Sequence, residues 1–504
     1  MWVHLYDPHA PYNPPPEFRA KAATAYDGEI AYADSQLARL LDALRARGVM
    51  DQTIVVVAGD HGEGLDEHGE RTHGMLLYDS TLRVPLIIAR PGAAAATRDE
   101  PVSLAEIAPT ILRAAGVTPP DAMTGRDLLD MVRLKPDLYS ETEYPRVAGW
   151  SPLQALTDGR WMAIRAGAAT EVYDVRADPR EEHDVASAQA SVAAAMTARA
   201  DAIHASAAAA NGHAISPDAQ ERLRSLGYVA SSAQPGPASG APHPATRIAA
   251  WNEFEEALSA LNTRRPDALS MLRRLAAANT GAPVMQTTFA RALKEAGNVD
   301  AALATYRRAA TRWPTDAGLL HDLAVAARDA ATAATGARAT ALRDEALRAD
   351  LAALTLDPNS AAAQNGVGLL AIDGARAADA AKAFERATAI DSNNASYWAN
   401  LGNARRATGD RTGAEQAYRR ALDVDARTAD AANGLGVLLV EANRPADAAP
   451  WFERAIAAAP DLVEARLNLG IALQQSGQIA RAAEEYRGVI AVSGWRRSPM
   501  SSSG

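Results

Sequence analysis

The sequence contains no cysteine in its 504 residues, and only 5% of its residues are aromatic. The absence of cysteine excludes disulfides, thiolate metal sites and cysteine nucleophiles within these residues. The sequence has no run of about 18 apolar residues, so it predicts no membrane-spanning helix. It also has no basic–apolar signal segment at its N-terminus. With 48% apolar and 22% charged residues, the chain is long enough for at least two sizeable cores.

The formal net charge of −10 is distributed unevenly. Residues 1–229 contain 32 acidic against 21 basic residues, whereas the remaining residues contain 29 against 30. Neither part has the basic stripe that nucleic-acid phosphates require, so we expect no nucleic-acid partner.

The N-terminal part alternates strand-like and helix-like runs. Residues 2–6, 53–58 and 84–89 are predicted strands, and apolar residues at helical spacing predict helices over 28–47 and 107–116. This alternation predicts a parallel α/β sheet with right-handed crossovers. Because a strand-like run follows Met1 directly, we expect the sequence to be a fragment or to start at a misplaced codon. Its compartment therefore stays open, and a periplasmic or cell-envelope location is compatible with a missing N-terminus.

The C-terminal part, residues 247–491, is an internal repeat with a period of 34 residues. A Pro-, Gly- and Ser-rich stretch, residues 230–246, precedes it and is predicted to be a flexible linker. Residues 492–504 are predicted to be a tail, and the longer, Ala-rich stretch 317–358 is predicted to be a degenerate or expanded repeat. The recurring residues are Leu401, Leu435 and Leu469, each followed by glycine, and the aromatic residues Phe384, Tyr418, Phe452 and Tyr486. This pattern resembles the tetratricopeptide family, which implies an all-α solenoid that binds a protein or peptide partner.

Histidines concentrate near the N-terminus, where five of the ten fall within the first 73 residues. Four of the five lie in three stretches, Asp7-Pro-His-Ala-Pro-Tyr12, Gly59-Asp-His-Gly-Glu63 and Glu67-His-Gly-Glu-Arg-Thr-His-Gly74. The first two follow predicted strands, where open α/β sheets bind ligands. An adjacent carboxylate and imidazole suit a divalent cation.

These stretches, together with Tyr78-Asp-Ser-Thr-Leu-Arg-Val-Pro-Leu-Ile-Ile88, resemble the C-terminal portion of a sulfatase in the alkaline-phosphatase superfamily. The resemblance implies an α/β sulfatase-like domain over residues 1–229 that is N-terminally incomplete. Its C-terminal subdomain is expected at about residues 135–190. The activity implied is cleavage of an organic sulfate ester.

The resemblance also implies roles for four residues. Asp60 and His61 would be ligands of a divalent metal ion, for which Ca²⁺ is favoured and Mg²⁺ or Mn²⁺ is an alternative. His9 and His73 would act as catalytic residues that bind the sulfate. The formylglycine nucleophile of the family derives from a Cys/Ser-x-Pro-x-Arg motif, which this sequence lacks. We therefore expect the chain as written to be incomplete and inactive.

Other interpretations stay open at this point. His73 replaces a lysine common in sulfatases, so a phosphoester or phosphonate hydrolase of the same superfamily is an alternative. A catalytically inactive remnant that serves as an interaction scaffold is another. Asp60 and His61 could also form an ordinary strand-end turn, and His9 and His73 could be loop histidines without a ligand.

Overall fold

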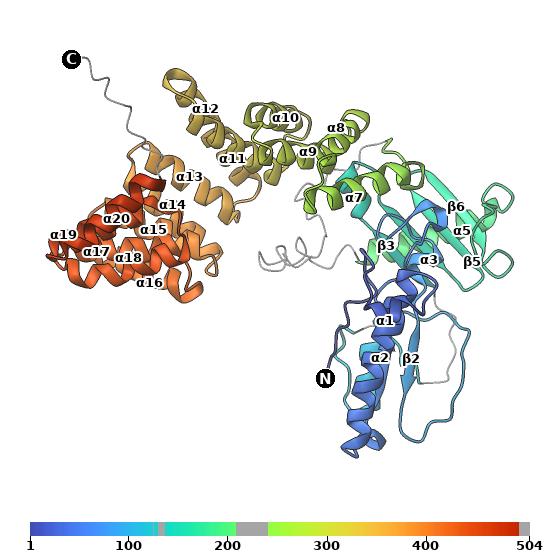
Figure 1. Ribbon diagram of the computed structural model, residues 1–504. Coiled ribbons are helices and arrows are strands. Elements are labelled where there is room, and N and C mark those ends of the chain that lie inside the picture. Colours follow the sequence, from blue (N-terminus) through green and yellow to red (C-terminus); the bar gives the residue numbers. More distant parts are fainter. Residues whose placement is uncertain (124, 130–136, 208–239, 493–504) are drawn as a thin grey trace. The chain divides into compact units, whose positions relative to one another are not determined.

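A computed structural model describes the chain in four ranges, residues 1–123, 125–129, 137–207 and 240–492 (Figure 1). The described residues form two compact units, one of residues 1–207 with 240–268 and the other of residues 269–492. Residues 230–239 of the predicted linker and residues 493–504 of the predicted tail lie outside the described residues. Within the described ranges, no helix is long and apolar enough to cross a membrane.

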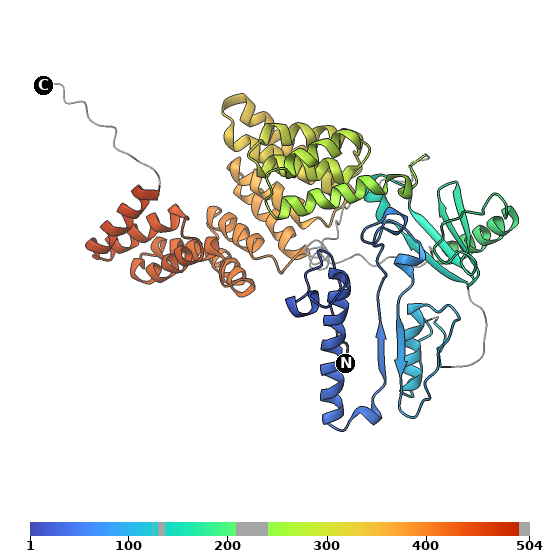
Figure 2. The ribbon, with the colours of Figure 1, turned by 45° about the vertical axis from the view of Figure 1, so that its right-hand side comes forward.

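The first unit combines short helices with two small sheets. Its helices are α1 (Pro16–Arg19), α2 (Ala25–Ala46), α3 (Asp79–Leu82), α4 (Ile107–Ala114), α5 (Ala190–Ala207) and α7 (Ile248–Asn262). Its strands are β1 (Val55–Ala58), β2 (Leu86–Ala89), β3 (Leu138–Thr142), β4 (Leu153–Thr157), β5 (Trp161–Ala166) and β6 (Ala169–Asp174). The long helix α2 runs alongside the ribbon formed by β1 and β2 (Figure 2).

The prediction of a parallel sheet is wrong for the described residues. β1 and β2 pair antiparallel, with Val55 opposite Ala89 and Ala58 opposite Leu86. A parallel pair needs a long crossover that usually contains a helix. The chain between these strands is instead taken up by glycine-rich turns and the four-residue helix α3.

The predicted strand over residues 2–6 is also absent. These residues have no regular structure, and the side chain of Trp2 is 92% exposed. No described segment pairs with their backbone, and an apolar run without a neighbouring strand cannot complete a ladder.

The second sheet is antiparallel throughout, in the order β3-β4-β5-β6. Helix α5 packs on one face of it. The core between them contains Leu156, Val172 and Met196, which are almost completely buried. An antiparallel sheet of this kind needs only one covered face, which explains how a single helix completes the layer.

Helix α7 belongs to the first unit, although the sequence pattern groups it with the repeats. The segment before it, within the predicted linker, is hydrogen-bonded to the same unit. The Ser151 amide donates to the Pro242 carbonyl over 3.0 Å, and the Ser151 hydroxyl donates to the Ala241 carbonyl over 2.9 Å.

The second unit is the predicted all-α solenoid, and that expectation is confirmed. Its helices are α8 (Ala268–Ala278), α9 (Pro283–Glu295), α10 (Val299–Arg312), α11 (Ala317–Ala333), α12 (Gly336–Leu356), α13 (Ala361–Asp373), α14 (Ala377–Ile390), α15 (Ala395–Ala407), α16 (Arg411–Val424), α17 (Ala429–Glu441), α18 (Pro445–Ala458), α19 (Val463–Gln475) and α20 (Ile479–Val492). From α9 to α20, consecutive helices pack as antiparallel hairpins, and each hairpin contacts the next. The expanded repeat corresponds to the long pair α11 and α12.

The repeating glycines permit close helix packing because an aromatic ring fills the space that their side chains would occupy. Tyr418 is completely buried and lies against Gly402 of its own hairpin and Gly434 of the next. In the following hairpin, a methyl group at Gly436 would lie 2.5 Å from Cε1 of Phe452. Phe384, Tyr418 and Phe452 are at most 1% exposed and belong to the core of the solenoid, and Tyr486 is partly buried against it.

We expect Gly436→Ala to destabilise the solenoid by about 1–3 kcal/mol, since the buried ring of Phe452 has no room to move. The matched control is Gly488→Ala, because a methyl group there meets only the flexible side chain of Arg466. The control should be neutral or stabilising by up to about 1 kcal/mol. Urea unfolding followed by circular dichroism measures both changes, and equal effects at the two sites would contradict the packing argument.

Candidate functional site

Strand β1 leads directly into the turn that carries Asp60 and His61. The turn passes so close to the backbone of α3 that a side chain at Gly62 would collide with the Ser80 carbonyl. The Gly62 amide donates instead to the Thr81 carbonyl over 2.8 Å. Glycine is therefore required at this position. The close contact with α3 fixes the backbone of the turn and with it the orientation of Asp60 and His61.

The structure brings together the three histidines to which the sequence assigns functional roles. The rings of His61 and His73 are stacked with their centroids 3.7 Å apart, and the ring of His9 lies 6.1 Å from that of His73. Asp60 lies beside His61, with 3.7 Å between its Oδ1 atom and Nε2. Its side chain is 81% exposed, so the carboxylate is open to a ligand.

In all three histidines the Nδ1 atom is occupied by a hydrogen bond. His61 Nδ1 lies 2.9 Å from the Gly62 carbonyl, and His9 Nδ1 lies 2.6 Å from the Ala10 carbonyl. His73 Nδ1 lies 3.2 Å from Oε1 of Glu63. Since carbonyl and carboxylate oxygens only accept, these bonds place a proton on Nδ1 and leave Nε2 for a ligand.

Buried carboxylates hold the histidine-bearing segments in position. Glu29, on α2, accepts from the amide of His9 over 3.0 Å and from the amide of Asn13 over 2.6 Å. Burial alone would raise the pKa of the Glu63 carboxyl, but the hydrogen bonds with His73 and Tyr12 and the nearby imidazoles together outweigh it, so the pKa lies below its usual value. Sequence reasoning missed Glu29, although a glutamate next to Ile30 within a predicted amphipathic helix was a usable signal.

The donor set fits part of a site for a hard divalent ion. The Asp60 carboxylate and the Nε2 atom of His61 are suitable ligand types, and the Nδ1 bond of His61 orients its ring as in known metal sites. These two residues supply only the Asp60 carboxylate oxygens toward the six to eight oxygen ligands typical of Ca²⁺, so further protein oxygens or waters would have to complete the shell.

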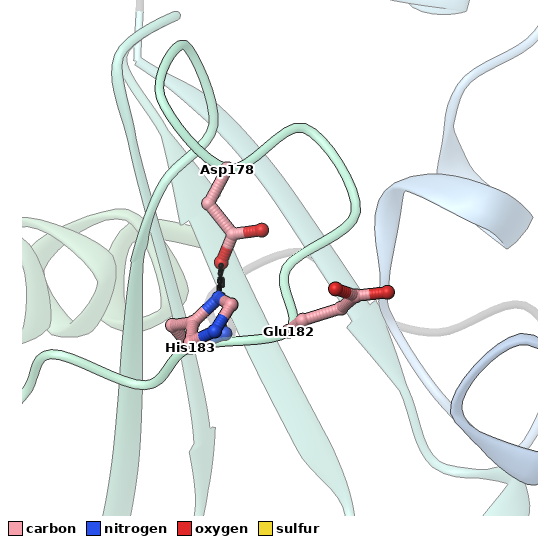
Figure 3. Close-up of side chains that lie close together, drawn as sticks. All are labelled: Asp178, Glu182 and His183. Carbon is pink, nitrogen blue, oxygen red and sulfur yellow. Dashed lines mark hydrogen bonds and ion pairs between the residues drawn. The ribbon is translucent and has the colours of Figure 1, made fainter.

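Among the described residues, one group of three acidic and histidine side chains lies close enough together to share a metal ion. It consists of Asp178, Glu182 and His183, on the loop after β6 (Figure 3). The Asp178 carboxylate accepts from the His183 amide over 2.8 Å and lies 3.4 Å from its Nδ1 atom. Glu182 and His183 are exposed, and the backbone bond explains the cluster as a stabilised loop.

Comparison with known families separates the chain into the same two parts. Residues 1–117 match the sulfatase family, and residues 67–205 match the C-terminal region of N-sulphoglucosamine sulphohydrolase. Residues 400–463 and 439–492 match tetratricopeptide repeats. The N-terminal part carries a sulfatase-family domain. The sequence resemblance to sulfatases and to tetratricopeptide repeats is thereby confirmed.

Individual relatives of the sulfatase domain are distant. A choline-sulfatase of Rhizobium meliloti is 30% identical over 169 residues, which are 32% of this chain and 32% of the relative. An arylsulfatase of Clostridium perfringens is 35% identical over 119 residues, which are 23% of this chain and 24% of the relative. The chain thus spans about a third of the length of the first of these and less of the second.

Among solved structures, a tetratricopeptide repeat protein from Parabacteroides merdae is 15% identical, with a TM-score of 0.41. The match covers 49% of this chain and 94% of that chain.

Two buried carboxyls of the sulfatase domain predict a pH-dependent stability. Burial raises the pKa of Glu70 and that of Glu181 to about 8. The folded state therefore keeps protons that the unfolded state releases above a pKa of about 4.5. We expect the free energy of unfolding to fall as pH rises through this window, by about 1.4 kcal/mol per pH unit for each carboxyl.

Calorimetric unfolding between about pH 5 and about pH 7.5 measures this slope. Glu70→Gln should reduce it by about half, because the amide is neutral throughout and only Glu181 still contributes. Glu253→Gln, at an exposed position of α7, should leave the slope unchanged. A slope that is the same in all three proteins would contradict the assignment.

Proposed function

We propose that the sulfatase domain contributes part of the active site of a hydrolase that cleaves organic sulfate esters. The convergence of His9, His61 and His73 beside the exposed Asp60 is the observation that carries this proposal. Asp60 and His61 would hold a divalent metal ion, preferably Ca²⁺. A bound ion of this kind supplies a Lewis acid for the sulfuryl oxygens.

His9 and His73 would bind the sulfate group. In its doubly protonated form, His73 donates a hydrogen bond from Nδ1–H to Glu63. Its Nε2–H group is then available to donate to a sulfuryl oxygen. His9, in its doubly protonated form, would keep the Nδ1–H bond to the Ala10 carbonyl and donate from Nε2 to a sulfuryl oxygen or to the leaving oxygen. Preorganised donors of this kind stabilise the negative charge that grows on these oxygens as the S–O bond breaks.

The repeats would add a binding surface for a protein or peptide partner. Stacked helical hairpins form an extended surface that single domains of this size do not offer.

A phosphoester or phosphonate hydrolase of the same superfamily is the second candidate. It is favoured by the stacking of His73 on His61, since a histidine beside a metal ligand can itself bind a metal ion. Titration with inorganic sulfate and with inorganic phosphate separates the two candidates, because tighter phosphate binding would favour the second.

We expect the full chain to bind Ca²⁺ weakly, with a Kd of about 1 mM, because it provides few ligands. Asp60→Asn should abolish binding by removing the only carboxylate of the pair. His204→Ala, on α5, is the control and should bind as the unaltered protein does. Isothermal titration calorimetry checks all three, and undiminished Ca²⁺ binding by Asp60→Asn would refute the metal role.

The full chain by itself should not turn over an aryl sulfate. Its sequence has neither cysteine nor a Ser-x-Pro-x-Arg motif from which formylglycine could form. Release of the phenol, followed by absorbance, provides the measurement. Turnover that disappears in Asp60→Asn would show that these residues complete a site with another nucleophile.

A further inference from the structure

Helix α7 contacts the loop that carries His73. The Thr72 hydroxyl donates to the Glu255 carboxylate, with 3.0 Å to Oε1 and 3.1 Å to Oε2. Asn252, three residues earlier on the helix, donates from Nδ2 to the Gly69 carbonyl over 2.7 Å. The helix and the loop are separated by more than 170 residues in sequence, so these bonds fix the loop from outside.

The residues directly before and after His73 in the sequence, Thr72 and Gly74, are both hydrogen-bonded. On one side, Thr72 is bonded to Glu255, and its carbonyl accepts from the Gly64 amide over 2.7 Å. On the other side, the Gly74 carbonyl accepts from the Thr142 hydroxyl of β3 over 2.9 Å. The backbone around the imidazole is thus fixed by two distant segments, α7 and β3, and by Gly64 of the same loop.

The helix itself is firmly packed against the sulfatase domain. Trp251 is 1% exposed, and its ring makes edge contacts with Tyr144 at 5.4 Å and with Trp150 at 6.2 Å between centroids. Its Nε1 atom donates to Oε1 of Glu255 over 3.0 Å. A buried tryptophan that also orients the carboxylate gives Glu255 little freedom to leave Thr72.

The side chain of Glu255 lies where burial destabilises a charged carboxylate unless hydrogen-bond donors compensate. Burial raises its pKa, whereas the bonds from Thr72 and Trp251 and the nearby His73 lower it in part. Neither donor is charged, so stability alone does not require an acid here. An apolar side chain would fill the space, but it would leave the Thr72 hydroxyl without this acceptor.

We propose that Glu255 is a positioning residue that orients His73 through Thr72. Helix α7 is then a functional element of the sulfatase domain and not the first repeat of the solenoid. The inference rests on the proposed function for the role of His73 in sulfate binding. The contacts that hold the loop stand independently of that role.

The test uses the full chain and measures two properties. The first is the affinity for inorganic sulfate, and the second is hydrogen exchange of the amides of residues 64–76. Glu255→Ala and Thr72→Val should each weaken sulfate binding about tenfold and increase exchange in this loop. Glu255→Gln keeps an acceptor oxygen and should stay within about threefold of the unaltered protein. Glu253→Ala, exposed on the same helix, is the matched control and should change neither property.

The double variant separates positioning from general destabilisation. If the two residues act as one unit, Thr72→Val with Glu255→Ala should bind sulfate no more weakly than either single variant. A lowered unfolding temperature with unchanged sulfate affinity and unchanged loop exchange would overturn the inference. Should Glu255→Ala fail to fold, the same two properties measured on the nearly isosteric Thr72→Val decide the question.

Failure of the proposed function has a different signature. In that case the unaltered chain does not bind sulfate at all, and loop exchange in Thr72→Val still decides whether α7 holds the loop. Normal exchange there would overturn the inference, and raised exchange would support it.

Discussion

Buried carboxylates take the place of secondary structure around the candidate site. The segments that carry the histidines are largely irregular, so few of their amides can bond within a helix or strand. Glu29 bonds the amide of His9, Glu70 bonds the amide of Met75 over 2.8 Å, and Glu181 bonds the amide of Asp79 over 2.7 Å. Each carboxylate lies at most 3% exposed, which makes these bonds strong and their loss expensive.

Neighbouring carboxylates raise the pKa of Glu70 further. Glu70 experiences the charges of Glu255 and Glu63 in addition to its burial, and all three effects raise its pKa. Burial and the neighbouring charges together therefore set the pKa of Glu70, the least exposed of these carboxyls. The pKa of Glu63 is lowered instead, because the hydrogen bond with His73 favours its charged form. The site therefore has an ionised carboxylate at Glu63 beside Glu70 and Glu255, whose raised pKa values favour the protonated form.

The sequence predicted the solenoid well, because a period of 34 residues fixes which positions meet at each helix contact. It also identified Asp60, His61, His9 and His73 as candidates, and the structure brings them into one cluster. The roles themselves remain proposals. The pairing of β1 with β2 was mispredicted, since apolar β-branched runs do not reveal whether their neighbour is parallel or antiparallel.

The contribution of α7 could not be read from the sequence. Glu255 and Thr72 are far apart along the chain, and the helix has the same alanine-rich composition as the repeats that follow. Only the folded structure pairs the two residues. Local composition therefore assigned the helix to the repeats, whereas the long-range hydrogen bonds assign it to the sulfatase domain.

The packing of α7 also decides where the chain can be divided. A cut at residue 246, where the change of composition suggests a boundary, would strip Trp251 and Phe254 from the sulfatase domain and open their apolar pocket to water. The short connection between Asn262 and Ala268 contains Arg264 in a left-handed turn and is the better place for a cut. Anyone who transplants these repeats onto another enzyme should begin after that turn and leave α7 behind.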